Sequence, residues 1–479
     1  MSLDTIPSLS RYFRPSGELS SLKADRNLSG KQGGFFRFGP ETICFGRCDA
    51  GVASRDPGCE LEDLSKYAQA NGDSLILPFD PEEIVQNLRE ERYVGTSANY
   101  ADRYSLTRDL YYLARPWMPL AIRKYLQQIY LRGWETLPFP TWPVDRTVDR
   151  LFEDLLRLTL QANGTTSIPF IWFWPDGANA CAIMTHDVEE EAGKAFCAEL
   201  MSIDESYKIP ASFQIVPEVR YSVELQFLDE IRTRGFEVNV QDLNHDGRLF
   251  LHKSEFERRV KLINQYGKSF QAVGFRSAVL YRNQAWFNLL DFEYDMSVPS
   301  VAHLDPQRGG CCTIMPYFVG GLVELPVTVS QDHTLFNILN DFSLDLWRKQ
   351  TELIVTHHGL MNFIVHPDYI LGKKAQDAYK SLLAFLANLR ERSGVWMALP
   401  KDVNRWWRQR DKMVLGRKAD EWVIEGEGSE RARVAYATLE DGHLVYSFAS
   451  ESTNAAALDC ADKAAQSETR AGIAFKGSH

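Results

Sequence analysis

Five clusters of acidic, imidazole and guanidinium side chains occur in the middle of the chain, each close behind a short apolar run. They occupy positions 185–189, 241–246, 276–281, 295–297 and 366–368. Carboxylates, imidazoles and a guanidinium gathered on one face are the groups that metal-assisted hydrolysis requires. Each cluster alone is weak evidence, because a carboxylate such as Asp187 behind a strand often caps a helix. Their order along the chain makes the joint interpretation much stronger.

The apolar runs alternate with longer helical stretches from about residue 181 to 400. The runs are 181–185, 211–216, 236–240, 272–275, 293–297, 322–327, 361–365 and 395–399, and the helical stretches are 192–207, 222–234, 254–266, 283–291, 334–350 and 373–392. Repeated βα units of this kind predict an α/β domain with a parallel sheet or barrel. Because such barrels carry their sites on the loops after the strands, the polar clusters are expected to meet at one end.

The rest of the chain has a different organisation. We predict four parts: an α+β accessory region at 1–170, the barrel at 171–400, a small antiparallel β extension at 401–449, and a disordered tail at 450–479. In the first part, 35–38 and 42–45 flank Gly39-Pro40 as a hairpin, and Asp80 followed by Pro81 is typical of a helix start. In the third part, the runs 422–424, 432–436 and 443–446 predict strands, the last two joined across Asp441-Gly442.

Composition limits the classes of function. The chain has 479 residues and a net charge of −11, so it repels polyanions as a whole, and nucleic acid is not expected as a partner. The eight cysteines include no CxxC pair, which argues against a disulfide framework or a structural zinc knot. The N-terminus lacks an apolar signal segment, and no window has the roughly 18 apolar residues of a spanning helix. We therefore expect a cytoplasmic protein, and the sequence leaves its oligomeric state open.

Two stretches combine basic and aromatic residues, at 104–134 and at 405–410. One interpretation is an amphipathic helix that packs its aromatic rings on the barrel with its arginines outward. The other is peripheral membrane contact or a hold on a charged glycan. We favour packing for both.

Between about residues 178 and 400 the chain resembles the polysaccharide deacetylases, the NodB-homology or carbohydrate esterase 4 family. Thr-His-Asp-Val-Glu at 185–189 is similar to the first family motif. The segments 235–246, 274–281, 294–297 and 363–366 are similar to the second to fifth motifs, in family order. The resemblance implies a distorted (β/α) barrel, in agreement with the number of apolar runs.

The resemblance also implies roles for individual residues. Asp187 would be the general base, oriented by Arg276, and His366 the general acid. Glu189 and His245 would be ligands of a divalent metal, expected to be zinc. Tyr281, Asp295 and Ser297 are expected to bind substrate.

Three positions depart from the family pattern. Gln241 stands where the first histidine of a His-x-x-x-His motif is expected, and a neutral amide oxygen is a poorer zinc ligand than imidazole nitrogen. Glu189 replaces the more usual aspartate, and Ala278 replaces a proline. We keep Gln241 in the predicted metal set with Glu189 and His245, and we expect weakened metal binding.

The leading hypothesis is a metal-dependent hydrolase that removes an N-acyl group, most often acetyl, from an amino sugar of a polysaccharide or glycan precursor. A second hypothesis is a catalytically silent glycan-binding protein that has lost the metal through Gln241. A third keeps the hydrolase chemistry but assigns a small amide, such as a formylated sugar or a ureide. The metal content of the purified protein separates the first two.

Overall fold

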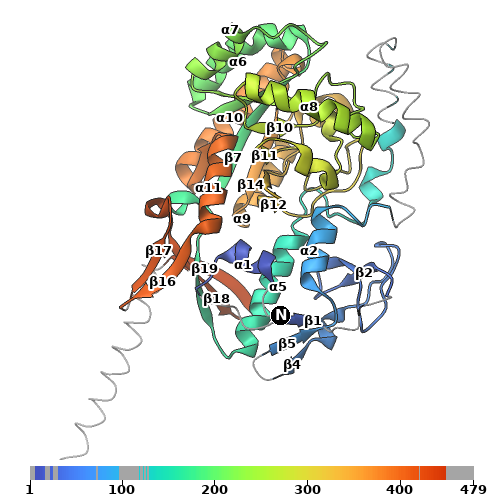
Figure 1. Ribbon diagram of the computed structural model, residues 1–479, viewed down its shortest axis with the longest axis vertical. Helices are drawn as coiled ribbons and strands as arrows, with labels where there is room; N and C mark the ends of the chain where they lie inside the picture. The colour runs from blue at the N-terminus through green and yellow to red at the C-terminus, as the bar shows by residue number, and fades with distance from the viewer. Residues whose placement is uncertain are drawn as a thin grey trace, which may run out of the picture.

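The computed structural model describes residues 6–16, 22–24, 28, 31–71, 74–95, 118, 122, 126, 129–419 and 421–448 (Figure 1). The tail predicted to be disordered, most of the basic-aromatic stretch at 104–134, and Cys460 lie outside these residues. Among the described cysteines all are free thiols, and only Cys59 is exposed. No helix in the described ranges has the length and apolar character needed to cross a membrane.

A nine-stranded, curled and mostly parallel sheet forms the centre of the molecule. Its strands are β7 (Ala180–Val188), β8 (Ala211–Ile215), β9 (Glu237–Gln241), β10 (Gly274–Arg276), β11 (Tyr294–Asp295), β12 (Tyr317–Val319), β13 (Leu322–Glu324), β14 (Leu360–Ile364) and β15 (Val395–Ala398). The order is β12-β13-β11-β10-β9-β8-β7-β14, and only β12 runs antiparallel to its neighbour. Each of the eight predicted runs contains a strand, and the predicted α/β fold class is confirmed.

The longest strand, β7, is paired along both edges. β14 pairs with Cys181 to Thr185 on one edge. On the other edge, β15 pairs with Ala180 to Ile183 and β8 with Met184 to Val188. β15 and β8 therefore lie end to end along the same edge of β7.

Side chains close the curled sheet where no strand ladder does. The hydroxyl of Thr328, in the segment after β13, donates to the Leu360 carbonyl at 2.6 Å and accepts the Asn362 backbone N–H at 3.1 Å. The Asn362 amide donates to the Leu325 carbonyl at 3.0 Å. These buried polar groups replace the ladder bonds that would otherwise be missing, since unpaired buried donors are costly.

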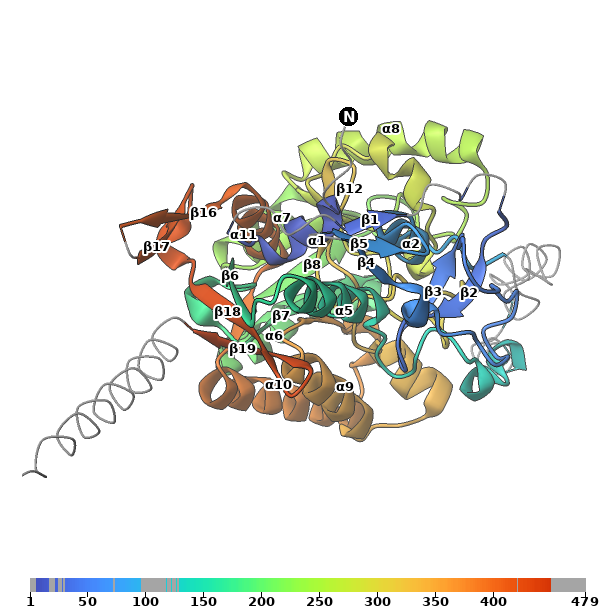
Figure 2. The ribbon, with the colours of Figure 1, turned by 90° about the horizontal axis from the view of Figure 1, so that it is seen from below.

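Helices cover the outside of the sheet, with α8 on one side and α9 and α10 on the other (Figure 2). They are α6 (Glu191–Tyr207), α7 (Leu225–Thr233), α8 (Lys253–Ser269), α9 (Asp345–Thr356), α10 (Lys373–Ser393) and α11 (Pro400–Lys412). The helix predicted at 334–350 is wrong as a single element. A π-helical segment, η7 (His333–Leu339), ends at Asn340, whose left-handed φ of 52° interrupts the chain before α9. The helix predicted at 283–291 is a 3₁₀ segment, η6 (Gln284–Leu289).

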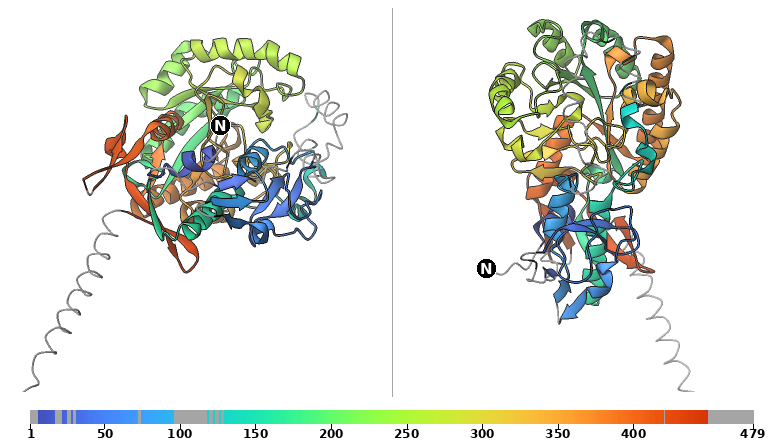
Figure 3. Two further views of the ribbon diagram at one scale, coloured as in Figure 1. Left: turned by 60° about the horizontal axis from the view of Figure 1, so that its bottom comes forward. Right: turned by 90° about the vertical axis from the view of Figure 1, so that its right-hand side faces the viewer.

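The N-terminal elements pack below the barrel (Figure 3, right). They are α1 (Pro7–Phe13), β1 (Leu22–Ala24), β2 (Gly34–Arg37), β3 (Ile43–Gly46), β4 (Gln69–Asn71), β5 (Ser74–Leu77), α2 (Pro81–Arg89) and α5 (Thr147–Ala162). The predicted hairpin is the antiparallel pair of β2 and β3. The predicted helix start is also confirmed, because the Asp80 carboxylate accepts the Glu82 N–H at 3.0 Å.

The C-terminal part consists of two hairpins after α11. β16 (Val414–Lys418) pairs with β17 (Glu421–Glu425), and β18 (Val434–Glu440) pairs with β19 (His443–Phe448) across the predicted turn. β18 also pairs with β6 (Ser167–Ile171), and the predicted boundary at residue 170 falls within β6. The strand just before the barrel domain and the last hairpin therefore share a sheet.

The stretch at 405–410 lies in α11. Trp406 and Trp407 are buried, as the packing interpretation expects, but Arg410 is buried too. Its guanidinium donates to the carbonyls of Trp172 at 2.9 Å and Ile171 at 2.7 Å, and to that of Tyr12. The outward placement predicted for the arginines is therefore wrong for Arg410, because main-chain carbonyls satisfy its charge inside.

Candidate active site

Five of the fifteen described non-glycine residues with positive φ lie in the loops after β8, β9 and β10. Val219 has a φ of 75°, Asp242 of 52°, His245 of 55°, Val279 of 59° and Leu280 of 54°. Side chains other than glycine rarely adopt this left-handed region, and bulky or β-branched ones least of all. Strained residues persist where the surrounding structure holds them, and they gather at functional sites. The carboxyl-terminal end of the sheet is therefore the first place to look for chemistry.

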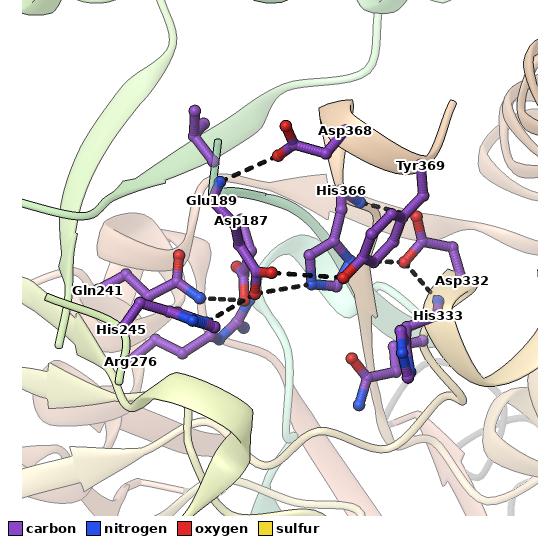
Figure 4. Close-up of polar contacts among 12 residues, drawn as sticks. Asp187, Glu189, Gln241, His245, Arg276, Asp332, His333, His366, Asp368 and Tyr369 are labelled. Carbon is purple, nitrogen blue, oxygen red and sulfur yellow. Dashed lines mark hydrogen bonds and ion pairs between the residues drawn. The ribbon is translucent and has the colours of Figure 1, made fainter. Parts of the chain in front are cut away.

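Arg276 fixes the carboxylate of Asp187 in the barrel (Figure 4). Its Nη1 lies 2.7 Å from Asp187 Oδ1 and 2.7 Å from the hydroxyl of Thr185, and its Nε donates to the Met296 carbonyl at 3.0 Å. The Arg276 side chain is fully buried and that of Asp187 nearly so. A charge-assisted pair of this kind holds the carboxylate in one orientation.

Gln241 contacts Asp187 from the other side. Its Nε2 donates to Asp187 Oδ2 at 3.1 Å, so both oxygens of this carboxylate accept hydrogen bonds. The other end of the amide, Oε1, is buried without a hydrogen-bond partner among the described residues. Gln241 thus supports the candidate base and also carries one free acceptor.

Glu189 lies between two histidines. Its Oε1 is 2.7 Å from His245 Nε2 and 3.4 Å from His366 Nε2, and its Oε2 accepts the Tyr369 hydroxyl at 3.4 Å. Burial by itself would raise the pKa of Glu189, but the two imidazoles hold it well below its usual value. The short contact between Glu189 and His245 lacks the alignment of a hydrogen bond, which leaves His245 Nε2 without a hydrogen-bond partner in the described structure.

Asp332 holds His366 through two contacts. Oδ1 lies 2.6 Å from Nδ1 of the ring, and Oδ2 accepts the His366 backbone N–H at 2.8 Å. Burial would lower the pKa of His366, but Asp332 and Glu189 together raise it well above its usual value. Because Nδ1 faces Asp332, Nε2 is the ring nitrogen that faces the site.

Asp187, Glu189 and His366 form a candidate metal-binding group. One ligand atom from each lies within 4.8 Å of the others. Carboxylate oxygens and imidazole nitrogen are ligands that zinc and other divalent ions accept. The predicted set of Glu189, Gln241 and His245 shares only Glu189 with this group.

The predicted substrate-binding residues are buried beside Arg276, whose Nε donates to the Met296 carbonyl between Asp295 and Ser297. Asp295 and Ser297 are fully buried, and the Ser297 hydroxyl donates to Asp295 Oδ1 at 2.8 Å. The same hydroxyl accepts the Ser277 N–H at 2.8 Å, so this pair supports the loop after β10. Tyr281 is also buried, in that loop. The geometry thus gives these residues supporting contacts with the protein itself.

Two carboxylates without a role predicted from the sequence organise the site: Asp332, outside the five clusters, and Asp368, within the cluster at 366–368. Asp332 lies several residues beyond the end of its apolar run. Helix capping is the feature that could have indicated it, because its Oδ1 accepts the His333 N–H at 2.8 Å at the start of η7. Asp368 accepts the backbone N–H groups of Glu189 at 3.0 Å and Gly193 at 2.8 Å. A Cβ on Gly193 would lie 2.4 Å from that carboxylate, so only glycine fits there.

The chain is similar in part to several solved structures. One is an assumed polysaccharide deacetylase from Mycobacterium smegmatis, with 18% identity, a TM-score of 0.42, and coverage of 52% of this chain and 98% of that chain. Another is PuuE allantoinase, with 11% identity, a TM-score of 0.39, and coverage of 49% and 92%. A third is a variant of the peptidoglycan deacetylase PdaC from Bacillus subtilis, with 11% identity, a TM-score of 0.33, and coverage of 50% and 96%. No protein-family model and no curated protein matches the chain. These identities and TM-scores are too low to support a function. A proposal about function therefore rests on the geometry of the site.

Proposed function

We propose that the protein is a metal-dependent hydrolase that removes an N-acyl group, with acetyl as the expected case, from an amino sugar of a polysaccharide or glycan precursor. The observation that carries this proposal is the group of Asp187, Glu189 and His366, whose ligand atoms lie within 4.8 Å at the ends of two neighbouring strands. A buried base, a buried acid and a carboxylate between them are the parts that amide hydrolysis needs.

The proton-transfer roles follow from the hydrogen bonds. Asp187, oriented by Arg276 at 2.7 Å, takes a proton from the attacking water. His366, protonated because Asp332 lies at its Nδ1, gives a proton from Nε2 to the leaving amine. The two residues come from adjacent strands, so both can reach one amide bond.

Glu189 and His245 are the residues that we assign to hold the ion. His245 Nε2 has no hydrogen-bond partner among the described residues and lies 2.7 Å from Glu189 Oε1, so both atoms are directed toward one small region. The free Oε1 of Gln241 is the third donor in the proposed set. When bound, a divalent ion would polarise the amide carbonyl and acidify water. This assignment shares only Glu189 with the candidate group of Asp187, Glu189 and His366, and it leaves His366 free for proton transfer.

One observation favours the silent glycan-binding alternative. Gln241 Nε2 already donates to Asp187 Oδ2 at 3.1 Å, so the candidate base has no free oxygen unless that amide moves. A protein of this kind would keep the cleft and bind a glycan without cleaving it.

Elemental analysis and an acyl-release screen on the full chain test the proposal. We expect a bound divalent ion and acetate release from N-acetylated amino-sugar oligomers, abolished in Asp187→Asn and His366→Gln. Glu199→Gln, an exposed carboxylate on α6, is the matched control and should keep full activity. Glycan binding without release, and with no metal, would instead support the silent alternative.

A further inference from the structure

A second cavity lies at the opposite end of the barrel from the candidate active site. Its volume is about 480 Å³, and it is bordered by Glu237, the first residue of β9, by Val273, just before β10, and by Glu293, just before β11. Gln241 and Arg276 are the last residues of β9 and β10, so the same strands separate the two sites. α11 crosses this amino-terminal end (Figure 1).

The wall that α11 supplies is basic. Lys401, Arg405, Arg408 and Lys412 all border the cavity. Their spacing of four, three and four residues places them on one helix face, in a row roughly 16 Å long. Arg232, at the end of α7, adds a fifth cation to the lining. This concentration of positive charge is notable in a chain whose net charge is −11.

Two of these cations have no hydrogen-bond or ion-pair partner among the residues that the structure describes. The side chains of Lys401 and Lys412 make no ion pair or hydrogen bond within the described part of the chain, whereas Arg405 pairs with Asp402 at 2.9 Å. Arg408 donates to the carbonyls of Glu293 and Gly321. The two lysine ammonium groups at the ends of the row are therefore available to a ligand.

The acidic residues of the lining are occupied by neutral donors. Glu237 accepts the Tyr294 hydroxyl at 2.6 Å and the Lys401 backbone N–H at 3.1 Å, and burial raises its pKa to about 7. Glu293 accepts the Asn404 amide at 2.8 Å, and Glu427 that of Gln409 at 3.0 Å. Five cations of the lining therefore face three carboxyl groups, and the remaining lone pairs of the carboxyl groups suit hydroxyl donors.

We infer that this cavity binds a phosphate-bearing ligand, with Lys412 contacting the phosphate oxygens and Lys401, at the other end of the row, adding positive charge at longer range. The carboxyl and amide groups of the wall accept sugar or glycerol hydroxyls. Phosphate suits the row because it carries more charge than a single carboxylate and matches both lysine and arginine donors. The volume lies in the range of small-molecule sites. A soluble sugar phosphate and a phospholipid headgroup both carry this chemistry.

Calorimetric titration of the full chain at low salt with glucose 1-phosphate tests the soluble source, and glucose serves as the uncharged probe. Flotation with phosphatidylcholine vesicles, with and without phosphatidic acid, tests the headgroup. We expect saturable binding of one of the two phosphate ligands. Binding should be at least about tenfold weaker in Lys401→Ala/Lys412→Ala, because the variant lacks the two positive charges offered to the phosphate.

The matched control is Lys261→Ala/Lys349→Ala, which removes two exposed lysines from α8 and α9. It should bind as the wild type does. Binding of glucose 1-phosphate assigns a soluble ligand, and binding of phosphatidic acid vesicles alone assigns a headgroup. If neither source binds, or if the two double variants bind equally well, the inference is overturned. Circular dichroism shows that the variants compared are folded, and the single variant Lys412→Ala repeats the test with one exposed change.

Discussion

The carboxylate of Asp332 contacts both the ring and the backbone of His366, with Oδ1 2.6 Å from Nδ1 and Oδ2 2.8 Å from the backbone nitrogen. A carboxylate held at two points cannot rotate away from the ring. The ring therefore turns Nδ1 toward Asp332. Its other nitrogen, Nε2, faces Glu189 at 3.4 Å.

Replacement of Asp332 by asparagine should lower the pKa of His366 and reduce activity. In the wild type the pKa of His366 is raised, so the ring stays protonated to higher pH. Asp332→Asn should therefore move the alkaline limb of the kcat/KM profile to lower pH and reduce kcat by roughly 10²-fold or more. NMR titration of the His366 ring measures the pKa directly. An unchanged ring pKa in the variant would contradict the assigned role.

Replacement of Arg276 by methionine should destabilise the fold, because Asp187 would keep a buried charge without its partner. Breaking a buried pair in this way costs about 3–5 kcal/mol. Urea unfolding of the variant and the wild type would measure this loss. The double variant Arg276→Met/Asp187→Asn should lose less than the sum of the two single variants. Arg405→Met, at an exposed position of α11, should change the free energy of unfolding by no more than about 0.5 kcal/mol.

Replacement of Gln241 by histidine should raise metal affinity, because an imidazole nitrogen replaces a neutral amide beside His245. Metal content and zinc titration of the two proteins measure this change. The substitution also removes the amide N–H that Asp187 Oδ2 accepts at 3.1 Å, so activity need not rise with affinity. A wild-type protein that already holds one tight ion per chain, with no change in the variant, would refute the weakened-site hypothesis.

Replacement of Glu324 by glutamine should make stability less dependent on pH. Glu324 and Asp295 are fully buried neighbours on paired strands. Burial raises the pKa of both carboxyl groups, and Asp295 raises that of Glu324 further. The folded protein therefore holds a proton that the unfolded chain releases near the ordinary glutamate pKa of 4.5.

Above that pH the folded state binds more protons than the unfolded state. The free energy of unfolding therefore falls as pH rises toward the folded pKa of Glu324. The amide of the Glu324→Gln variant can donate to Asp295 at every pH. The urea midpoint of this variant should therefore fall less between pH 5 and pH 8 than that of the wild type. Glu199→Gln is the exposed control. Parallel pH dependence in Glu324→Gln and the wild type would show that the pair shares no proton.

The strands of the sheet could be predicted because each is a short apolar run, and their parallel order brings Asp187, Arg276 and His366 to one end. The roles of these residues stay predictions. Asp332 was beyond reach, because it stands after a polar connection whose path only the folded chain defines. The break at Asn340 was equally hidden, because the apolar pattern continues through it. Asn362 offered a readable signal, since a polar side chain within an apolar strand needs a partner, which is the Leu325 carbonyl.

The end-to-end placement of β15 and β8 on one edge of β7 has a consequence during synthesis. β8 follows β7 closely in the chain, whereas β15 begins only at Val395. Until that residue leaves the ribosome, the first half of β7 presents an open row of N–H and C=O groups next to apolar side chains. Such an open edge can recruit strands of other chains. Nascent or truncated chains that end before Val395 should therefore aggregate more readily than the full chain, and they should depend more on chaperones that shield such edges.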